Sequence, residues 1–215
     1  MSRSGRLAVD NPFSTRSIRP GAIAYQFPPG WSAERLVERL RDHDWQGQIV
    51  GPHGSGKSAL LAALLPAIRR AGRDTYLVQL HDGQRRLPGG NAALGSLARG
   101  TVVIVDGYEQ LGLWSRRGLR RTCRRFGLGL LVTTHVSSGF PDLLRTATSL
   151  ETARRIVEQL LQGDSAIVSP EEINRRFAMH QGNVRELLFD LYDAYEERHL
   201  GTTRSGEQGR FSGGG

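Results

Sequence analysis

The only lysine of the chain lies in a glycine-rich segment, "GPHGSGKS", that begins at residue 51. The segment has the pattern G-x-x-x-x-G-K-[ST], in which glycines let backbone N–H groups surround phosphate oxygens. In this pattern Lys57 would contact the β- and γ-phosphates of a nucleotide, and the Ser58 hydroxyl would be a ligand of Mg²⁺. The predicted phosphate-binding residues are Gly51, Pro52, His53, Gly54, Ser55, Gly56, Lys57, Ser58 and Ala59.

Asp106 is the second residue with predicted metal chemistry, because it ends the apolar run "TVVIVD". A carboxylate at the end of a buried strand is costly unless it faces a ligand or a metal. We therefore predict that Asp106 and Ser58 hold Mg²⁺ together. Glu109 is the nearest further carboxylate and is the candidate to polarise an attacking water. The alternatives from sequence are a helix-capping role for Asp106 and a surface position for Glu109.

The elements that must position these residues alternate between strands and helices. Apolar or β-branched runs predict strands over 47–50, 74–80, 101–106, 128–135 and 143–149. Helical spacing of leucines predicts a helix from Lys57, directly after the glycine loop, and the basic segment 115–126 is a second helix. This alternation predicts an α/β, three-layer fold with a parallel five-stranded sheet and helices on both faces.

Residues after 149 contain helical patterns only. The segment "SPEEINRRF" opens with Ser169, Pro170 and Glu172, which is a capping-box pattern, and "GNVRELLFDLYDAYEERH" begins a further helix at Asn183. The sequence thus predicts four regions. They are an extended N-terminal arm at 1–31, the phosphate-binding core at 32–149, a small helical lid at 150–199 and a disordered tail at 200–215.

The composition indicates a globular protein of the cytoplasm. Hydrophobic residues make up 38% of the 215 residues and charged residues 23%. No apolar run approaches the ~20 residues of a membrane helix, so we expect no membrane insertion. The first residues lack the apolar core of a signal peptide. The single cysteine, Cys123, excludes an internal disulfide and fits a reducing compartment.

The formal net charge of +8 raises the question of a nucleic-acid partner. The densest basic run is "SRRGLRRTCRRF", which carries Arg116, Arg117, Arg120, Arg121, Arg124 and Arg125. On a helix, residues four apart lie on the same side, so these arginines form one broad positive face. This face would bind phosphates or an acidic partner surface, or it is a solvated exterior.

The order of these motifs resembles that of the AAA+ ATPases, a family of P-loop nucleoside triphosphatases. The resemblance spans about residues 30–198 and implies that the ligands are ATP and Mg²⁺. It further implies that Thr134, or Thr133 with His135 adjacent, is the sensor-1 group near the γ-phosphate. By the same resemblance Arg185, in "GNVR", is the sensor-2 arginine of the lid, and the arm at 11–31 lies where such proteins contact adenine.

Two departures from the family pattern affect the predicted activity. The family places Asp-Glu after the apolar strand, whereas Gly107 follows Asp106 here, which predicts slow hydrolysis. The loop at 81–91 lacks the aromatic residue with which substrate-threading members grip their substrate, which argues against an unfoldase. Arg145 is the candidate for an arginine finger acting across a subunit boundary, so a homo-oligomer stays a hypothesis.

We therefore predict an ATP-binding protein that is a slow, Mg²⁺-dependent ATPase. It would act as a molecular switch or assembly accessory for an unknown protein client. The alternatives are a P-loop small-molecule kinase and a nucleotide-dependent nucleic-acid-binding module with little turnover. A GTPase is excluded because the guanine-reading Asn-Lys-x-Asp motif needs a lysine outside the phosphate loop. A transporter-type ATPase would need an LSGGQ-like signature, and the sequence has none.

Overall fold

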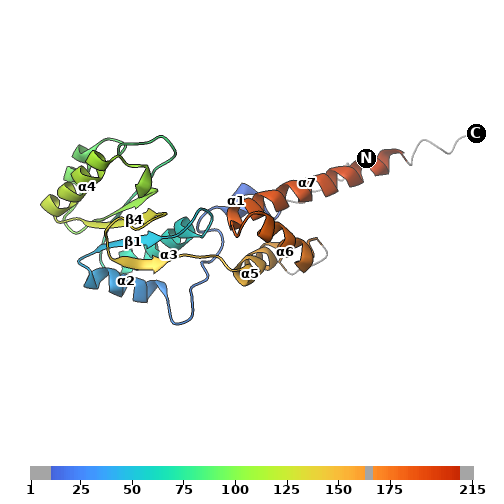
Figure 1. Cartoon of the computed structure of the whole chain (residues 1–215), viewed down its shortest axis with the longest axis horizontal. Helices are drawn as coiled ribbons and strands as arrows, with labels where there is room; N and C mark the ends of the chain where they lie inside the picture. Colours follow the sequence, from blue (N-terminus) through green and yellow to red (C-terminus); the bar gives the residue numbers. More distant parts are fainter. Residues whose placement is uncertain (1–10, 163–166, 209–215) are drawn as a thin grey trace, which may run out of the picture. The chain divides into compact units, whose positions relative to one another are not determined.

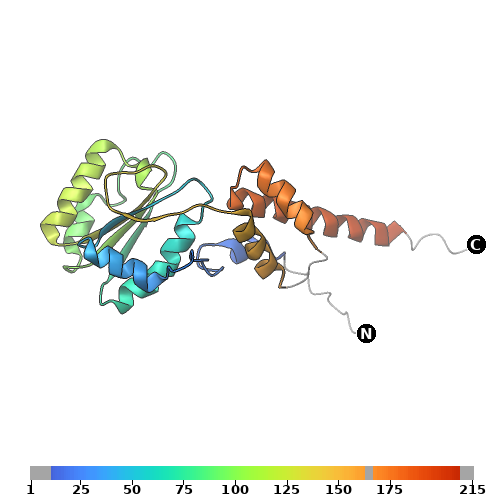
Figure 2. The same ribbon diagram turned by 60° about the horizontal axis from the view of Figure 1, so that its bottom comes forward.

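The chain forms two compact units (Figures 1 and 2). The computed structural model describes residues 11–162 and 167–208, with side chains described as far as Arg198 in the last helix. One unit spans residues 24–147, and the other joins residues 11–23 to the described residues from Thr148 onward. Within the described part of the chain, no helix is both long enough and apolar enough to cross a membrane.

The first unit is built on a sheet of five parallel strands. These are β1 (Gln46–Val50), β2 (Thr75–Gln79), β3 (Val102–Asp106), β4 (Gly129–Thr134) and β5 (Asp142–Arg145). Their order is β2-β3-β4-β1-β5, with all pairs parallel. The predicted parallel five-stranded sheet is confirmed. Because β4 lies between β1 and β3, the carboxyl ends of these three strands meet at one edge of the sheet.

Helices cover both faces of this sheet, as predicted (Figure 1). On one face, α2 (Ala33–Asp42) and α3 (Lys57–Arg70) pack against Ile104 and Leu131. On the other face, α4 (Leu113–Phe126) and the 3₁₀ turn η1 (Asn91–Ser96) pack against Val105 and Val132. Successive residues of β3 and β4 thus enter opposite cores, which is why both strands read as continuous apolar runs.

Gln48 is a fully buried amide within β1, and its side chain bonds to the neighbouring strand β5 and to the loop after β4. Its Nε2 donates to Ser137 Oγ at 2.9 Å and to Asp142 Oδ1 at 2.7 Å. Its Oε1 accepts from the backbone N–H of Ser138 at 2.8 Å. The amide therefore fastens β5 and the loop after β4 to β1, and its burial is compensated by hydrogen bonds.

The second unit contains the helices α5 (Leu150–Leu161), α6 (Pro170–Met179) and α7 (Val184–Gln208). The predicted cap of α6 is present, because Ser169 Oγ accepts from the N–H of Glu172 at 3.2 Å. The Asn183 side chain accepts from the N–H groups of Arg185 and Glu186 and caps α7. The helical character predicted for this region is thus observed.

The boundaries of the second unit differ from the predicted ones at both ends. Residues 11–23 belong to this unit rather than to a free arm, with a short helix α1 (Thr15–Ile18). Phe13 is fully buried in the helical core, with its ring edge-on to Tyr195 at 6.5 Å. At the other end, α7 continues to Gln208, into the segment predicted as a disordered tail. Residues 1–10 and 209–215 of those predictions lie outside the described residues.

Candidate functional site

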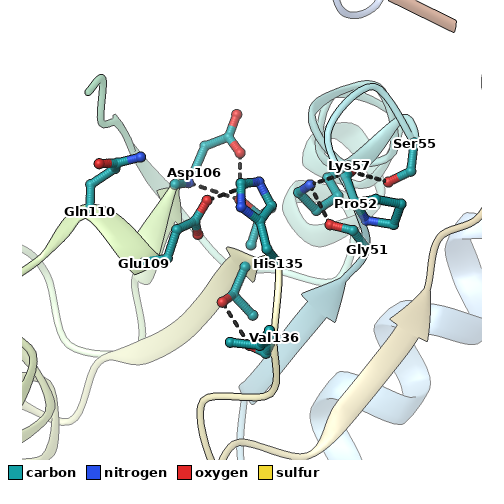
Figure 3. A network of polar contacts seen from close by, with 12 residues as sticks. Gly51, Pro52, Ser55, Lys57, Asp106, Glu109, Gln110, His135 and Val136 are labelled. Atoms are coloured by element: carbon teal, nitrogen blue, oxygen red, sulfur yellow. Dashed lines mark hydrogen bonds and ion pairs between the residues drawn. The ribbon is translucent and has the colours of Figure 1, made fainter. Parts of the chain in front are cut away.

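The glycine-rich segment forms the loop between β1 and α3, as its pattern predicts (Figure 3). Gly54 and Gly56 have φ of 68° and 87°, a backbone conformation that favours glycine. At Gly51 a Cβ atom would lie 2.1 Å from Thr146 Oγ1 and 2.5 Å from the Thr146 carbonyl oxygen, so a larger residue does not fit. No side chain caps the first turn of α3. Its N–H groups and the helix dipole therefore suit an anion.

The Lys57 ammonium lies against the backbone of its own loop (Figure 3). Its Nζ donates to the carbonyl oxygens of Gly51 at 2.6 Å and Pro52 at 2.7 Å. Burial lowers the pKa of Lys57 below its ordinary value, while the nearby carboxylates of Glu109 and Asp106 oppose this shift. Both carboxylates that the sequence singles out are thus close enough to act on this lysine.

Asp106 and Ser58, the two predicted metal ligands, lie in direct contact. Ser58 Oγ donates to Asp106 Oδ2 at 2.7 Å, across 48 positions of sequence. The other oxygen, Oδ1, accepts from Thr133 Oγ1 at 2.5 Å, and that hydroxyl accepts from the N–H of Gly107 at 2.9 Å. A carboxylate and a hydroxyl are oxygen donors of the kind that Mg²⁺ takes alongside substrate phosphates. The residues present therefore fit this cation.

The two threonines at the end of β4 have different surroundings, although both are fully buried. The Thr133 hydroxyl contacts Asp106, as described. The Thr134 hydroxyl instead donates to the carbonyl oxygen of Val136 at 2.8 Å and lies 3.2 Å from Ser138 Oγ. Of the two alternatives that the sequence left open for the sensor-1 group, Thr133 is the one that lies beside the predicted metal ligand.

Glu109 lies on the 3₁₀ turn η2 (Tyr108–Gln110), directly after β3, and its carboxylate faces the site (Figure 3). Its Oε1 is 3.1 Å from His135 Nε2, and its Oε2 is buried with no hydrogen-bond partner among the described residues. A Cβ atom at Gly107 would lie 2.9 Å from the Leu80 carbonyl oxygen. A glutamate directly after Asp106 would thus be crowded, and the first carboxylate after Asp106 is Glu109.

The segment before α2 brings aromatic rings next to the phosphate loop. The Tyr25 ring lies 3.5 Å from the position of a Cβ atom on Gly56, and it packs edge-on to Phe27 with ring centroids 5.0 Å apart. Burial raises the pKa of the Tyr25 hydroxyl above its ordinary value. These residues belong to the part of the predicted adenine-contacting segment that folds with the sheet.

The two predicted arginines lie in different units. Arg145 ends β5 in the first unit, where it is exposed and pairs with Asp142 at 2.7 Å. Arg185 is exposed in the first turn of α7, in the second unit, with its guanidinium over the Phe189 ring. The roles of both arginines stay predictions.

Sequence reasoning missed the contacts of two histidines. His53 of the loop and His135 after β4 have ring centroids 3.7 Å apart, and His135 also contacts Glu109. A histidine inside the phosphate loop and another directly after a buried strand were the available signals. Nothing in their spacing shows that they meet, because the strand order that joins them is a property of the folded sheet.

The sheet order, the loop between β1 and α3, and an acidic residue at the end of β3 together match the fold of the P-loop NTPases. Solved structures that share this fold include the following two. One is the replication initiator DnaA bound to AMPPCP and single-stranded DNA, with a TM-score of 0.50 and 14% identity over 84% of this chain and 69% of that one. The other is a Walker-type ATPase of Pyrococcus abyssi, with a TM-score of 0.53 and 14% identity over 92% of this chain and 77% of that one.

At these identities the likeness establishes the fold alone. A scan of the sequence against protein-family models gives no match, and a search of curated proteins gives none either.

Proposed function

We propose that this chain binds ATP at the loop of residues 51–59 and hydrolyses it slowly with Mg²⁺. The observation that carries the proposal is the contact between Ser58 and Asp106 at 2.7 Å, beside an uncapped helix N-terminus. When bound, Mg²⁺ would neutralise phosphate charge and stabilise the charge that develops during transfer. Ser58 and Asp106 would hold the cation, and Lys57 would contact the phosphates.

Glu109 would orient the attacking water and accept its proton through Oε2, the buried oxygen without a partner among the described residues. Thr133 would fix the Asp106 carboxylate through its bond to Oδ1. The position of the acid at 109, with Gly107 directly after Asp106, supports slow turnover. Slow turnover suits a molecular switch or an assembly accessory for a protein client.

The single lysine offers a direct test of nucleotide binding. An amine-reactive reagent has only Lys57 and the terminal amine to modify in the intact chain. We expect Mg·ATP to protect Lys57, and not the terminal amine, when modification is followed by peptide mass spectrometry. Lys57→Ala should weaken ATP binding at least about tenfold, since it removes charge-assisted hydrogen bonds to phosphate. Equal modification of Lys57 with and without ATP would contradict the proposal.

Phosphate release separates the ATPase from its closest alternative. An ATPase releases phosphate with no acceptor present, whereas a small-molecule kinase transfers it only when its acceptor is added. We expect acceptor-independent release that Glu109→Gln reduces while ATP binding is retained. The same samples, measured for molecular mass with and without ATP, test the homo-oligomer in which Arg145 would reach a neighbouring site.

A second candidate function, binding of single-stranded nucleic acid, is favoured by the exposed side of α4. Trp114 is 83% exposed with the Arg117 guanidinium over its ring, and Arg121 and Arg125 follow along the same side of the helix. We call these four residues the α4 stripe. Exposed aromatic rings combined with arginines suit stacked bases and phosphates.

The six arginines of α4 do not form one equivalent face as the sequence suggested. Arg116 donates to the carbonyl oxygens of Glu109 at 2.7 Å and Leu111 at 2.8 Å. Arg120 donates to the Ser138 carbonyl oxygen and, at 3.2 Å, to the Tyr108 hydroxyl. These two arginines hold the loops beside the site, and Arg117, Arg121, Arg124 and Arg125 are left for a partner.

Fluorescence of Trp114 and salt titration test this second function. We expect a single-stranded oligonucleotide to bind with an affinity that falls as salt rises. In the double variant Arg117→Glu/Arg121→Glu, the slope of log affinity against log salt concentration should decrease by about the amount expected for the loss of two phosphate contacts. Arg86→Glu/Arg175→Glu is the control, since it makes the same charge change at exposed positions outside α4. If both double variants lose the same affinity for the oligonucleotide, only the net charge of the chain matters, and the α4 stripe is not a binding site.

A further inference from the structure

Three side chains from three separate elements form a continuous contact between the phosphate loop and Glu109. His53 lies in the loop, His135 directly follows β4, and Glu109 lies on η2. The two imidazole centroids are 3.7 Å apart, and His135 Nε2 is 3.1 Å from Glu109 Oε1. Figure 3 shows His135 facing Glu109 at the edge of the sheet where β3 and β4 end.

The geometry fixes which nitrogen of His135 carries a proton. An ionised carboxylate only accepts hydrogen bonds, so His135 Nε2 must donate to Glu109 Oε1. In the neutral ring the proton is therefore on Nε2, and Nδ1 has the lone pair. One carboxylate oxygen of Glu109 is thereby engaged, while Oε2 is buried and has no partner among the described residues. The imidazole holds the carboxylate in one orientation with the other oxygen free.

We propose that His135 is a positioning residue that orients Glu109 for proton transfer from water, and that His53 makes this orientation depend on the phosphate loop. The proposal rests on the ATPase function proposed above. His53 is one of the loop residues expected to surround the phosphates, so a change in loop conformation moves the ring on which His135 packs. His53 and His135 thereby connect the loop to Glu109, the group proposed to activate water, by contacts that do not involve Asp106.

The surroundings of His135 favour its neutral form. Burial lowers the pKa of His135 below 6.5, and the charges of Lys57 and His53 lower it further. The carboxylates of Glu109 and Asp82 act in the opposite direction. Protonation of His135 at low pH would place an imidazolium beside Glu109, and this positive charge would make the carboxylate a weaker base. Turnover should therefore fall as the pH drops through the His135 pKa.

Imidazole titration by NMR tests the contact in the full-length chain and needs no ATP turnover. We expect Glu109→Gln to lower the pKa of His135 by about one pH unit, because a neighbouring negative charge is removed. His53→Ala should raise it, because the ring that packs against His135 and lowers its pKa is removed. His43→Gln is the control, since His43 is exposed at the end of α2, and it should leave His135 unchanged.

Kinetics of two substitutions at one position then test the positioning role. Glutamine can place an N–H donor close to where His135 Nε2 lies, but it does not titrate, whereas leucine cannot donate. We expect His135→Gln to retain most of kcat and to lose the fall in activity at low pH. His135→Leu should lose about tenfold in kcat with KM changed less than about twofold, the size of one hydrogen bond to a charged group.

Equal kcat in the two variants, or an unchanged acid limb in His135→Gln, would overturn the positioning role. If the pKa of His135 is the same in Glu109→Gln as in the unsubstituted chain, the contact between the two side chains is overturned as well. If both NMR shifts appear but the unsubstituted chain does not hydrolyse ATP, the proposed function fails, and the positioning role fails with it, while the contact stands. The two kinds of failure are therefore distinguishable.

Discussion

The two threonines that end β4 provide a matched pair for testing which hydroxyl serves the candidate site. Both side chains are fully buried, and valine replaces either with nearly the same shape. In Thr133→Val, Asp106 Oδ1 loses a hydrogen bond of 2.5 Å and the N–H of Gly107 loses its acceptor. In Thr134→Val, the lost bonds are to the carbonyl oxygen of Val136 and to Ser138.

The difference between these environments sets the expected magnitudes. A hydrogen bond to a charged group contributes about 1.5–3 kcal/mol, and a neutral one about 1 kcal/mol. If about 2 kcal/mol of the Thr133 contact is realised when Asp106 holds Mg²⁺, turnover falls about thirtyfold. The Mg²⁺ concentration for half-maximal turnover should rise in the same variant. Thr134→Val should stay within about fivefold of the unsubstituted chain.

Steady-state phosphate release, titrated with Mg²⁺ at saturating ATP, measures both quantities. Circular dichroism of each variant shows whether the helices are retained, so that a folding defect is recognised. If Thr134→Val impairs turnover as much as Thr133→Val, the contact with Asp106 does not decide the sensor role. If Thr134→Val alone impairs it, Thr134 is the sensor, and the assignment made from the hydrogen bonds is wrong.

Three further outcomes follow from the contacts described. Gly51→Ala should lower the unfolding midpoint of the sheet unit and abolish ATP binding, because its Cβ would lie 2.5 Å from the Thr146 carbonyl oxygen, and overpacking of this kind costs about 1–3 kcal/mol or more. Cys123 should react with a thiol reagent only on unfolding, since burial raises its pKa to about 12; fast reaction in the native chain would contradict the packing of α4. Burial opposes ionisation of Glu172, but its bonds with Arg198 and a second arginine lower its pKa. This contribution to the stability of the helical unit should be complete above about pH 4.5 and lost as the pH falls further, which helicity measured against pH would follow.

The sheet could be predicted from sequence because its central strands are buried on both faces. The apolar residues of the runs "VVIVD" and "GLLVTT" all enter one core or the other, so apolar composition locates these strands. The same property prevented a choice between Thr133 and Thr134. A strand without alternation of polar and apolar residues does not reveal which side chain faces which neighbour.

The phosphate loop was predictable because its pattern is local, whereas the pair of Glu109 and His135 was not. The pattern of the loop reports backbone requirements within eight consecutive residues. The contact of His135 with Glu109 needs β4 to lie beside β3, which is a result of the sheet order. The burial of Phe13 could not be predicted from the sequence for a related reason, because its partners, such as Tyr195, lie near the other end of the chain.

The contacts of Gln48 indicate the order in which the parts of this site assemble during folding. Its amide is satisfied only when β5 and the loop after β4 have both reached β1. The contact between β1 and β5 joins residues 94 positions apart, and such non-local contacts form slowly during folding. Since His135 is the first residue of that loop, a chain in which β5 has not yet docked lacks the bonds that fasten the loop carrying this histidine to β1. Competence for hydrolysis should therefore appear late in refolding, after most of the helical signal has been recovered.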